Sequence, residues 1–361
     1  MRYFLVLLLA VAVPEVIASD RYRFRHWLPY YDYLWERRAG ACALQIQQYH
    51  NNNRTEVRRR AVCAVVVDCL LTNVTESIKS NLASADILLG LTPQILSLAG
   101  PRNGELALLS TQRPVLTSLL SFGFPSMSIS GLFVSVDVTS LLRKPVARTA
   151  RSYHLWLHEQ TKGRQLSIFT LQYALAAGAV ANSIYTSVYL DSRTASGWRC
   201  GANYMPLAWS MSGSLIAMVE MLAIRTRCSS QGSTRRRPKQ PITRLSWIKC
   251  HLHNSIRPET KDTCMTEILF WIANFMSVIQ TLFGTAVLSS LLFVSFLDAL
   301  PILVRYGLSA AACNVLLRLE LGGLRRELEE KRASSDEEKI RHFEMVERRS
   351  GWDLHLMRTI R

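Results

Sequence analysis

Acidic residues are scarce in this sequence, especially within its apolar tracts. The chain has 43 Lys and Arg against 27 Asp and Glu, which gives a formal net charge of +16. A basic excess of this size makes nucleic-acid binding a candidate function. However, the basic residues flank apolar tracts in short stretches, without interleaved aromatics and without a recognition-helix, zinc-finger or RNA-binding signature. We therefore expect no nucleic-acid partner.

Motifs that carry catalysis or bind metals are also lacking. The chain has no glycine-rich phosphate loop, no G-x-S-x-G turn and no paired-carboxylate motif. His154 and His158 would share one face of a helix, but no acid lies between them. The spacing in Cys250-His251-Leu252-His253 matches no zinc module. The sequence therefore supports no enzymatic activity and predicts no catalytic residue, cofactor or metal.

Long apolar blocks are present instead, and apolar residues make up 49% of the chain. Such blocks must be helical in a membrane, because backbone polar groups surrounded by lipid need internal partners. The sequence therefore predicts an all-α fold, a polytopic helical membrane bundle in contact with the lipid bilayer. The predicted spans are 81–100, 166–190, 204–224, 268–297 and 300–317. The last contains Arg305, so four crossings are the alternative.

Residues 1–18 have the pattern of a cleavable signal peptide. Arg2 precedes an apolar core over 4–13, and Val16-Ile17-Ala18 offers small residues before the cleavage point. An uncleaved signal anchor is the alternative, and both place the following segment outside the cytosol. We therefore expect a membrane of the secretory pathway, in particular the plasma membrane.

The region that follows, 19–80, is polar and predicted to be exoplasmic. It contains two N-x-S/T sequons, at Asn53 and Asn73, which predict a glycoprotein. Three of the eight cysteines lie in this region, and a fourth lies in the loop between the second and third spans, on the same predicted side. An even set is expected where disulfides form, and three pairings are possible. The set is Cys42, Cys63, Cys69 and Cys200.

Lysine and arginine in short loops predict the orientation of the spans. Loops 143–164 and 225–262 are rich in basic residues, with one acid in the first and two in the second, so we expect both to be cytosolic. The charged tail, 325–361, is then cytosolic as well. The basic loops are also candidates for contact with anionic lipid.

The tract 115–136 does not fit this topology as a crossing. It is uncharged and long enough to span, but a crossing here would place the first basic loop outside. Gly123, Pro125 and Gly131 interrupt it. We therefore predict a re-entrant or interfacial segment, which is tolerated only where it is buried in protein or lines water.

Three ionisable residues fall within predicted spans, where each charge is costly. Asp86 and Arg305 are at similar predicted depth with opposite charge, so we expect them to pair. Glu220 could pair with Arg225 or Arg318. A proton or ion relay through Asp86 and Glu220 is the alternative.

Small and polar residues recur at four-residue spacing in the second predicted span. They are Ala174, Gly178 and Asn182. This spacing allows helices to approach closely. We expect it to mark a packing face and not a substrate site.

Three segments resemble a family of uncharacterised multi-pass membrane proteins of filamentous ascomycete fungi. Here they read NLASADILLGLTPQILSLAG, GELALLSTQRPVLTSLLSFGFPSM and CNVLLRLELGGLR. The family has a segment like ASAxxLLGLTPxIL, an acidic turn, a segment like LLSxxRPLLAxLLxxGxP and a closing cysteine–apolar–E-L-x-G-x-R segment. The resemblance runs from about Cys63 to Arg325, and Asp86 and Phe124 depart from its pattern. It implies the topology but no activity.

Two functions remain open from the sequence. The first is a structural or sensory membrane protein with a glycosylated exoplasmic head, which predicts an exterior joined by disulfides. The second is a small-solute or ion transporter or channel that uses the broken first span and the tract 115–136. The second predicts polar residues that converge at mid-membrane.

Overall fold

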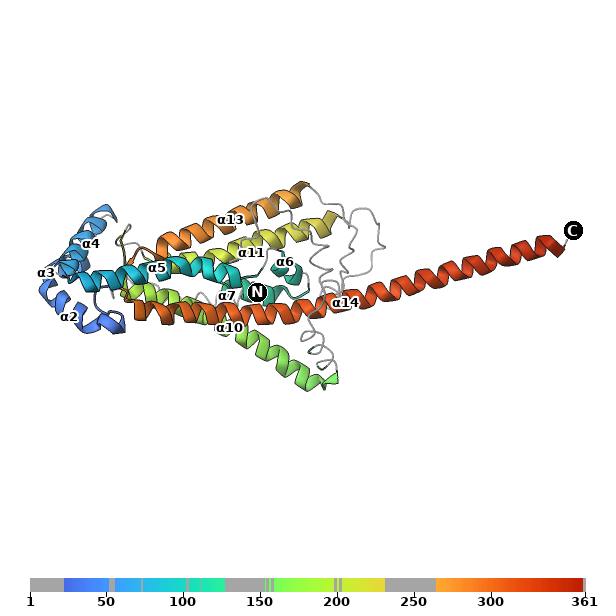
Figure 1. Cartoon of the computed structure of the whole chain (residues 1–361), viewed down its shortest axis with the longest axis horizontal. Helices are drawn as coiled ribbons and strands as arrows, with labels where there is room; N and C mark the ends of the chain where they lie inside the picture. Colours follow the sequence, from blue (N-terminus) through green and yellow to red (C-terminus); the bar gives the residue numbers. More distant parts are fainter. Residues whose placement is uncertain are drawn as a thin grey trace.

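The computed structural model describes residues 23–51, 56–72, 74–101, 104–110, 112–126, 153, 156, 159–197, 200, 203–230 and 264–359. Over these residues the chain is a helical bundle with one two-residue β-ladder, which confirms the predicted all-α class. The bundle is elongated (Figure 1). The N-terminal helices lie at one end, here called the head end, and the last helix projects beyond the other, here called the tail end.

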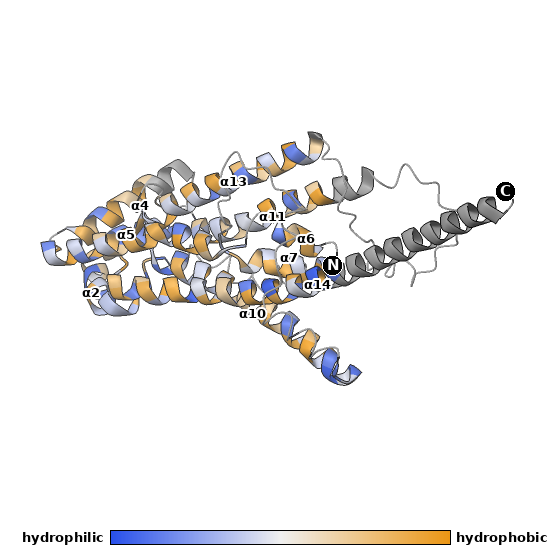
Figure 2. Ribbon diagram, turned by 45° about the vertical axis from the view of Figure 1, so that its right-hand side comes forward, coloured by the Kyte–Doolittle hydropathy of each residue, from blue (hydrophilic) through white to orange (hydrophobic). Residues whose placement is uncertain are grey.

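Five helices are long and apolar enough to cross a membrane, as the sequence predicts. Apolar residues run along the length of the bundle helices (Figure 2). The fourth span ends at Leu288 and not at 297, because the chain turns there into a short strand. The five helices are α5 (Glu76–Ala99), α10 (Lys162–Arg193), α11 (Met205–Ser230), α13 (Cys264–Leu288) and α14 (Phe296–Thr359).

Four short helices form the head. They are η1 (Pro29–Tyr31), α2 (Asp32–Ala41), α3 (Ala43–Asn51) and α4 (Glu56–Leu71). Buried aromatic rings hold them together, and Phe293, which follows α13, lies among these rings. Its centroid is 4.9 Å from that of Trp35 and 5.3 Å from that of Trp27. The head is therefore packed around a side chain that the membrane bundle supplies.

Two loops of the bundle meet beneath the head. Strand β1 (Ala195–Ser196), after α10, pairs antiparallel with β2 (Leu291–Leu292), after α13. The Gly197 N–H extends the ladder to the Ser290 carbonyl at 2.7 Å. This ladder satisfies backbone groups that would otherwise be buried without partners, and it fixes the two loops against each other.

Two short helices lie between α5 and α10 in the chain. They are α6 (Glu105–Ser110) and α7 (Pro114–Gly123). Pro114 starts α7, where a missing N–H costs nothing. α7 packs against α10, α11 and α14, and most of its residues are buried. At ten residues it is about 15 Å long, half of a ~30 Å hydrocarbon layer, so this part of the tract 115–136 does not cross.

α14 begins with a reciprocal cap and continues far beyond the bundle. The Ser295 hydroxyl accepts the Asp298 N–H at 3.1 Å and donates to the Asp298 carboxylate at 2.7 Å. The hydroxyl thus satisfies one backbone donor at the helix start, and the carboxylate orients the hydroxyl. From there the helix runs 64 residues to Thr359, about 96 Å. The predicted charged tail is therefore a direct continuation of the fifth span (Figure 1).

The prediction that Ala174 and Gly178 lie on a packing face is wrong. Ala174 and Gly178 are exposed, and no atom lies within 4 Å of a methyl group placed on Gly178. Ala176 and Ala179 face the interior instead. Only Asn182 of the predicted set meets another helix, through hydrogen bonds to α14.

Several predicted features lie outside the described residues. They are the signal peptide 1–18, the sequons at Asn53 and Asn73, residues 127–136 of the predicted re-entrant tract, most of the loop 143–164 and the part of the loop 225–262 beyond Ser230.

Candidate functional site

The predicted pair of Asp86 and Arg305 is not formed. Across the described ranges, the Asp86 carboxylate has no ion pair or hydrogen bond. Arg305 packs instead against α10, with its guanidinium carbon 5.6 Å from the ring centroids of Tyr185 and Tyr189. Similar depth was therefore insufficient evidence for a pair, because Arg305 faces the tyrosines of α10 and not the helix that carries Asp86.

Glu220 holds a turn of the backbone. Its side chain is fully buried on α11, and its Oε2 accepts the N–H of Gly104 at 3.1 Å. Gly104 lies between α5 and α6, with a φ of 86° that favours glycine. The buried carboxylate thus fixes the point where the chain turns from α5 into the α6–α7 segment.

A polar network centred on Glu320 fixes the start of α7. Arg113, which directly precedes α7, donates from Nη1 to Glu320 Oε1 on α14 at 3.1 Å and to Gln172 Oε1 on α10 at 3.3 Å. Its guanidinium also lies 4.5 Å over the Phe169 ring. The Glu320 side chain is 6% exposed and that of Arg113 is 28% exposed. The network therefore lies at the border of the protein interior.

Gln172 joins a third element to this network. Its Nε2 donates to Glu320 Oε1 at 2.7 Å and to the Tyr153 hydroxyl at 3.2 Å. Burial, and then the nearby Glu320 carboxylate, raise the pKa of the Tyr153 phenol. The phenol therefore stays protonated at neutral pH.

A second ion pair joins the same two parts of the chain. Arg325 Nη2 on α14 lies 3.8 Å from Glu105 Oε1 at the start of α6. In the first pair the base precedes α7 and the acid lies on α14, and in the second pair the roles are reversed. Glu105 is the first residue of α6, Arg113 follows that helix, and Glu320 and Arg325 lie on one stretch of α14. The segments 104–126 and 313–325 are thus joined reciprocally at the tail end.

α7 reaches from this network to the middle of the bundle. At its end, a methyl group on Gly123 would lie 2.5 Å from Cys313 Sγ and 3.6 Å from Ala179 Cβ. Cys313 is seven residues from Glu320, and Ala179 is seven residues from Gln172. Seven residues correspond to about 10 Å along a helix, so Gly123 lies about 10 Å from the polar network along both α10 and α14. Only a residue without a side chain fits there.

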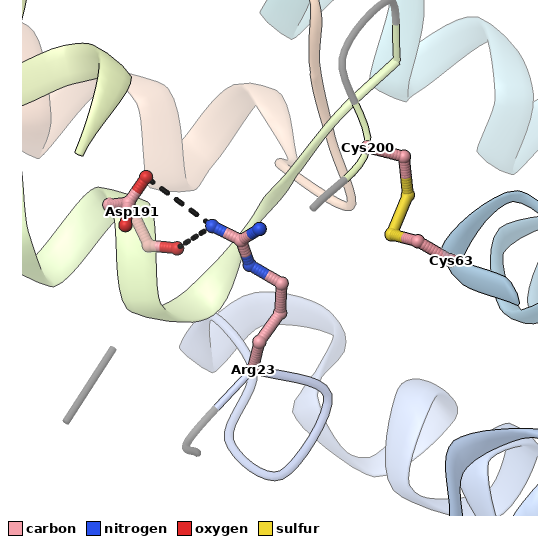
Figure 3. Close-up of a disulfide and its surroundings, with 4 residues drawn as sticks. All are labelled: Arg23, Cys63, Asp191 and Cys200. Atoms are coloured by element: carbon pink, nitrogen blue, oxygen red, sulfur yellow. Dashed lines mark hydrogen bonds and ion pairs between the residues drawn. A yellow bond between two sulfur atoms is a disulfide. The ribbon is translucent and has the colours of Figure 1, made fainter. Parts of the chain in front are cut away.

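Two disulfides lie at the opposite end, and one of them joins the head to the bundle. They are Cys42–Cys69, within the head, and Cys63–Cys200, which ties α4 to the loop between α10 and α11 (Figure 3). The structure thus selects one of the three pairings that the sequence left open. The remaining described cysteine whose side chain is placed, Cys313, is free and buried.

Polar contacts reinforce this junction. Arg23 Nη2 lies 3.4 Å from Asp191 Oδ1 at the end of α10, with both side chains almost fully buried (Figure 3). Arg193 Nη1 donates to the Trp27 carbonyl at 2.7 Å. The Tyr30 N–H donates to Asp298 Oδ1 at 3.3 Å. The partners of Asp191, Arg193 and Asp298 were not predictable from the sequence, which shows only that these charged residues lie near the ends of apolar tracts.

Hydroxyl groups occupy the bundle interior between the two ends. The Ser187 hydroxyl lies 3.0 Å from that of Ser210 and 2.8 Å from that of Tyr306. Nearer α7, Gln280 Nε2 donates to the Pro125 carbonyl at 3.2 Å. Hydrogen bonds of this kind tie membrane helices together. Tyr306 is seven residues from Cys313, so the Ser187 group lies toward the head end, whereas Gln280 lies nearer the middle of the bundle.

Across the described part of the chain, the arrangement connects elements and presents no recognisable catalytic geometry. No group of three or more His, Cys, Asp or Glu side chains that could hold a metal ion occurs among the described residues. Comparison of the chain with protein-family models, with curated proteins and with solved structures gives no match.

Proposed function

We propose that this chain is a structural or sensory membrane protein, in which a glycosylated exoplasmic head is coupled to a cytosolic helix. The observation that carries the proposal is the continuity of α14. Its first turn contacts the head through Asp298 and Tyr30, and its middle contacts α6 and α7. The same helix then runs to Thr359 without interruption, so a displacement at the head reaches the tail along one rigid element.

The proposal places the head outside the cytosol. Disulfides persist in oxidising compartments, and all four bonded cysteines lie at the head end. The basic loops then face the cytosol and meet anionic lipid. We propose the plasma membrane as the location, glycans at Asn53 and Asn73, and membership in the fungal family whose segments the chain resembles.

Topology mapping tests this orientation. We expect Asn53→Gln or Asn73→Gln to increase electrophoretic mobility, as removal of the glycan by an endoglycosidase does. A C-terminal tag should be digested by protease added to the cytosolic side of intact vesicles. A protected tag combined with a glycosylated head would overturn the proposal, because α14 would then end on the same side as the head.

Coupling through α14 is tested by interrupting the helix. Distances between spin labels at Tyr33 in the head and Arg326 at the tail end should form one narrow distribution in the full chain. Insertion of Gly-Gly-Pro after Ser309 should broaden that distribution, whereas the same insertion after Arg332, beyond both labels, should not. An equally narrow distribution after the first insertion would show that α14 does not transmit position.

A transporter or channel is the second candidate, and the polar groups in the bundle interior favour it. The hydroxyls around Ser187 and the half-length helix α7 are features that a solute path would use. Ion or solute flux into proteoliposomes that is lost in Glu220→Gln, with normal folding and delivery, would replace the structural proposal. Absence of flux above that of protein-free vesicles would favour the first.

A further inference from the structure

Arg305 lies on the surface of the bundle without an acidic partner in the part of the chain that the structure describes. Its neighbours along α14, Val304 and Leu308, are 55% and 63% exposed. Tyr185, which its guanidinium contacts, is 51% exposed. An apolar surface at this position faces lipid, so the positive charge of Arg305 faces lipid as well.

A second arginine shares the same aromatic surface. The Arg193 guanidinium lies 4.5 Å over the Tyr189 ring, which Arg305 contacts at 5.6 Å. The rings of Tyr189 and Tyr185 are stacked, with centroids 5.9 Å apart. We call Tyr185, Tyr189, Arg193 and Arg305 the arginine–tyrosine ladder.

Among the described residues, no acidic side chain balances the charges of the ladder. Arg193 donates a hydrogen bond to a carbonyl and not to a carboxylate. Neither phenol hydroxyl forms a hydrogen bond with another described residue. Two like charges therefore flank one ring, with unused donors beside them. An anion placed there would relieve their repulsion and accept those hydrogen bonds.

The ladder lies at the depth of the lipid headgroups. Cys313, near the middle of the fifth span, is eight residues below Arg305, so Arg305 Cα lies about 12 Å above mid-bundle. Its side chain points toward the helix start, as helical side chains do. The guanidinium therefore reaches the border of a hydrocarbon layer whose half-thickness is about 15 Å. Arg193, at the end of α10, lies higher still.

We propose that the arginine–tyrosine ladder binds the phosphate of an anionic phospholipid in the leaflet at the head end. The planar guanidinium of Arg305 presents paired N–H donors to a phosphate, and Tyr185 adds a hydroxyl. The exposed Val304 and Leu308 lie where the acyl chains of the same lipid descend. A dissolved phosphate ion lacks those chains and gains nothing from this surface.

This site differs from the basic loops, which the proposed topology assigns to the cytosolic leaflet. It also does not depend on the proposed structural or sensory role, because lipid binding and coupling through α14 are measured separately. Lipid at the ladder would bridge α10 and α14 at the head end, where Asn182 already joins the same two helices.

Lipid retention tests the site. The full chain is reconstituted in nanodiscs of equal parts phosphatidylcholine and phosphatidylglycerol, extracted in mild detergent and examined by native mass spectrometry. We expect the wild type to retain phosphatidylglycerol preferentially. Arg305→Gln should lower that preference about fivefold, the loss expected for one cation at a membrane surface. Arg318→Gln, an exposed arginine of the same helix near the tail end, should leave it unchanged.

Three results would overturn the proposal: equal retention of both lipids by the wild type, an unchanged preference in Arg305→Gln, or displacement of the lipid by millimolar inorganic phosphate. Folding of each variant is checked by the intact Cys63–Cys200 disulfide. If Arg305→Gln does not fold, the lipid preference of the double variant Tyr185→Phe/Tyr189→Phe tests the proposal instead. It keeps the rings and removes the hydroxyls, and the preference should fall about threefold; no fall contradicts the proposal.

Discussion

The head end and the tail end of this bundle are held by different chemistry. At the head end, the disulfide Cys63–Cys200 and the buried Arg23–Asp191 pair join the N-terminal helices to the bundle. At the tail end, two ion pairs hold α6 and α7, Arg113–Glu320 and Arg325–Glu105. The head junction is therefore covalent and fixed, whereas the tail junction consists of contacts that can separate and reform.

The difference matters because one helix belongs to both junctions. Asp298 at the start of α14 contacts the head, and Glu320 on the same helix contacts the base of α7. The head that Asp298 contacts is joined covalently to the bundle, whereas the contact of Glu320 is electrostatic, so we expect α14 to respond at the tail end. The comparison thus predicts a rigid head and an adjustable tail end.

Removal of the head disulfides should produce the largest loss of stability. Cys63→Ser/Cys200→Ser opens a link between residues 137 apart, and Cys42→Ser/Cys69→Ser one between residues 27 apart. Loop-closure entropy predicts losses of about 5 and about 3.5 kcal/mol. Equilibrium unfolding in mixed micelles measures both. Equal losses would contradict an entropic origin, and no loss for Cys63→Ser/Cys200→Ser would contradict the covalent junction.

Glu320→Ala should produce the next largest effect. It leaves Arg113 and the Gln172 amide without their shared acceptor, and breaking a buried charge pair costs about 3 kcal/mol. The unfolding free energy should fall by that amount, and hydrogen exchange should increase in α7 but not in the head. Arg318→Ala, an exposed site two residues away, should change stability by less than about 0.5 kcal/mol. Equal effects of the two variants would exclude the network.

Gly123→Ala tests the fit of α7 against α14. The added methyl group meets Cys313 Sγ at 2.5 Å, and overpacking of this kind costs about 1–3 kcal/mol. Cys313→Ala should restore part of the loss. Gly178→Ala is the matched control, because nothing lies within 4 Å; it should be neutral or stabilising by about 0.5–1 kcal/mol. A loss in Gly178→Ala equal to that in Gly123→Ala would show that helix backbone, and not the contact, is responsible.

The smallest effect is expected from an exposed pair at the start of α5. Lys79 Nζ lies 2.8 Å from Glu76 Oε1, but the Glu76 side chain is 88% exposed. Water screens such a pair, which contributes less than about 0.5 kcal/mol. Glu76→Gln should therefore leave the unfolding midpoint nearly unchanged, and a loss comparable to that of Glu320→Ala would remove the distinction between buried and exposed pairs.

The number of long helices was predictable because lipid leaves the backbone no alternative to internal hydrogen bonds. The cysteine set was likewise predictable, but its pairing was not, since the sequence allowed three. In general, the sequence did not predict which residue each buried polar side chain would contact. Arg113 and Glu320 lie 207 residues apart, and no periodicity relates them.

Predictions from the depth or spacing of residues failed where the contact depended on the direction in which a side chain leaves its helix. Asp86 and Arg305 were matched by depth, but Arg305 faces the tyrosines of α10. Gly178 was matched by four-residue spacing, but its side of α10 is open. In a membrane both faces of a helix are apolar, so the hydrophobic pattern does not indicate which one meets protein.

The central claim is that α7 enters the bundle and meets α14 near the middle of the bundle. An engineered disulfide between residues 123 and 313 tests it most directly. Gly123→Cys is introduced with Cys228, Cys250 and Cys264 changed to Ser and a protease site placed within 231–241. The native disulfides then stay in the N-terminal fragment. After mild oxidation and cleavage, a bond between residues 123 and 313 should keep the two fragments together on a non-reducing gel, and Gly178→Cys should not. Separate fragments from folded Gly123→Cys protein would contradict the account.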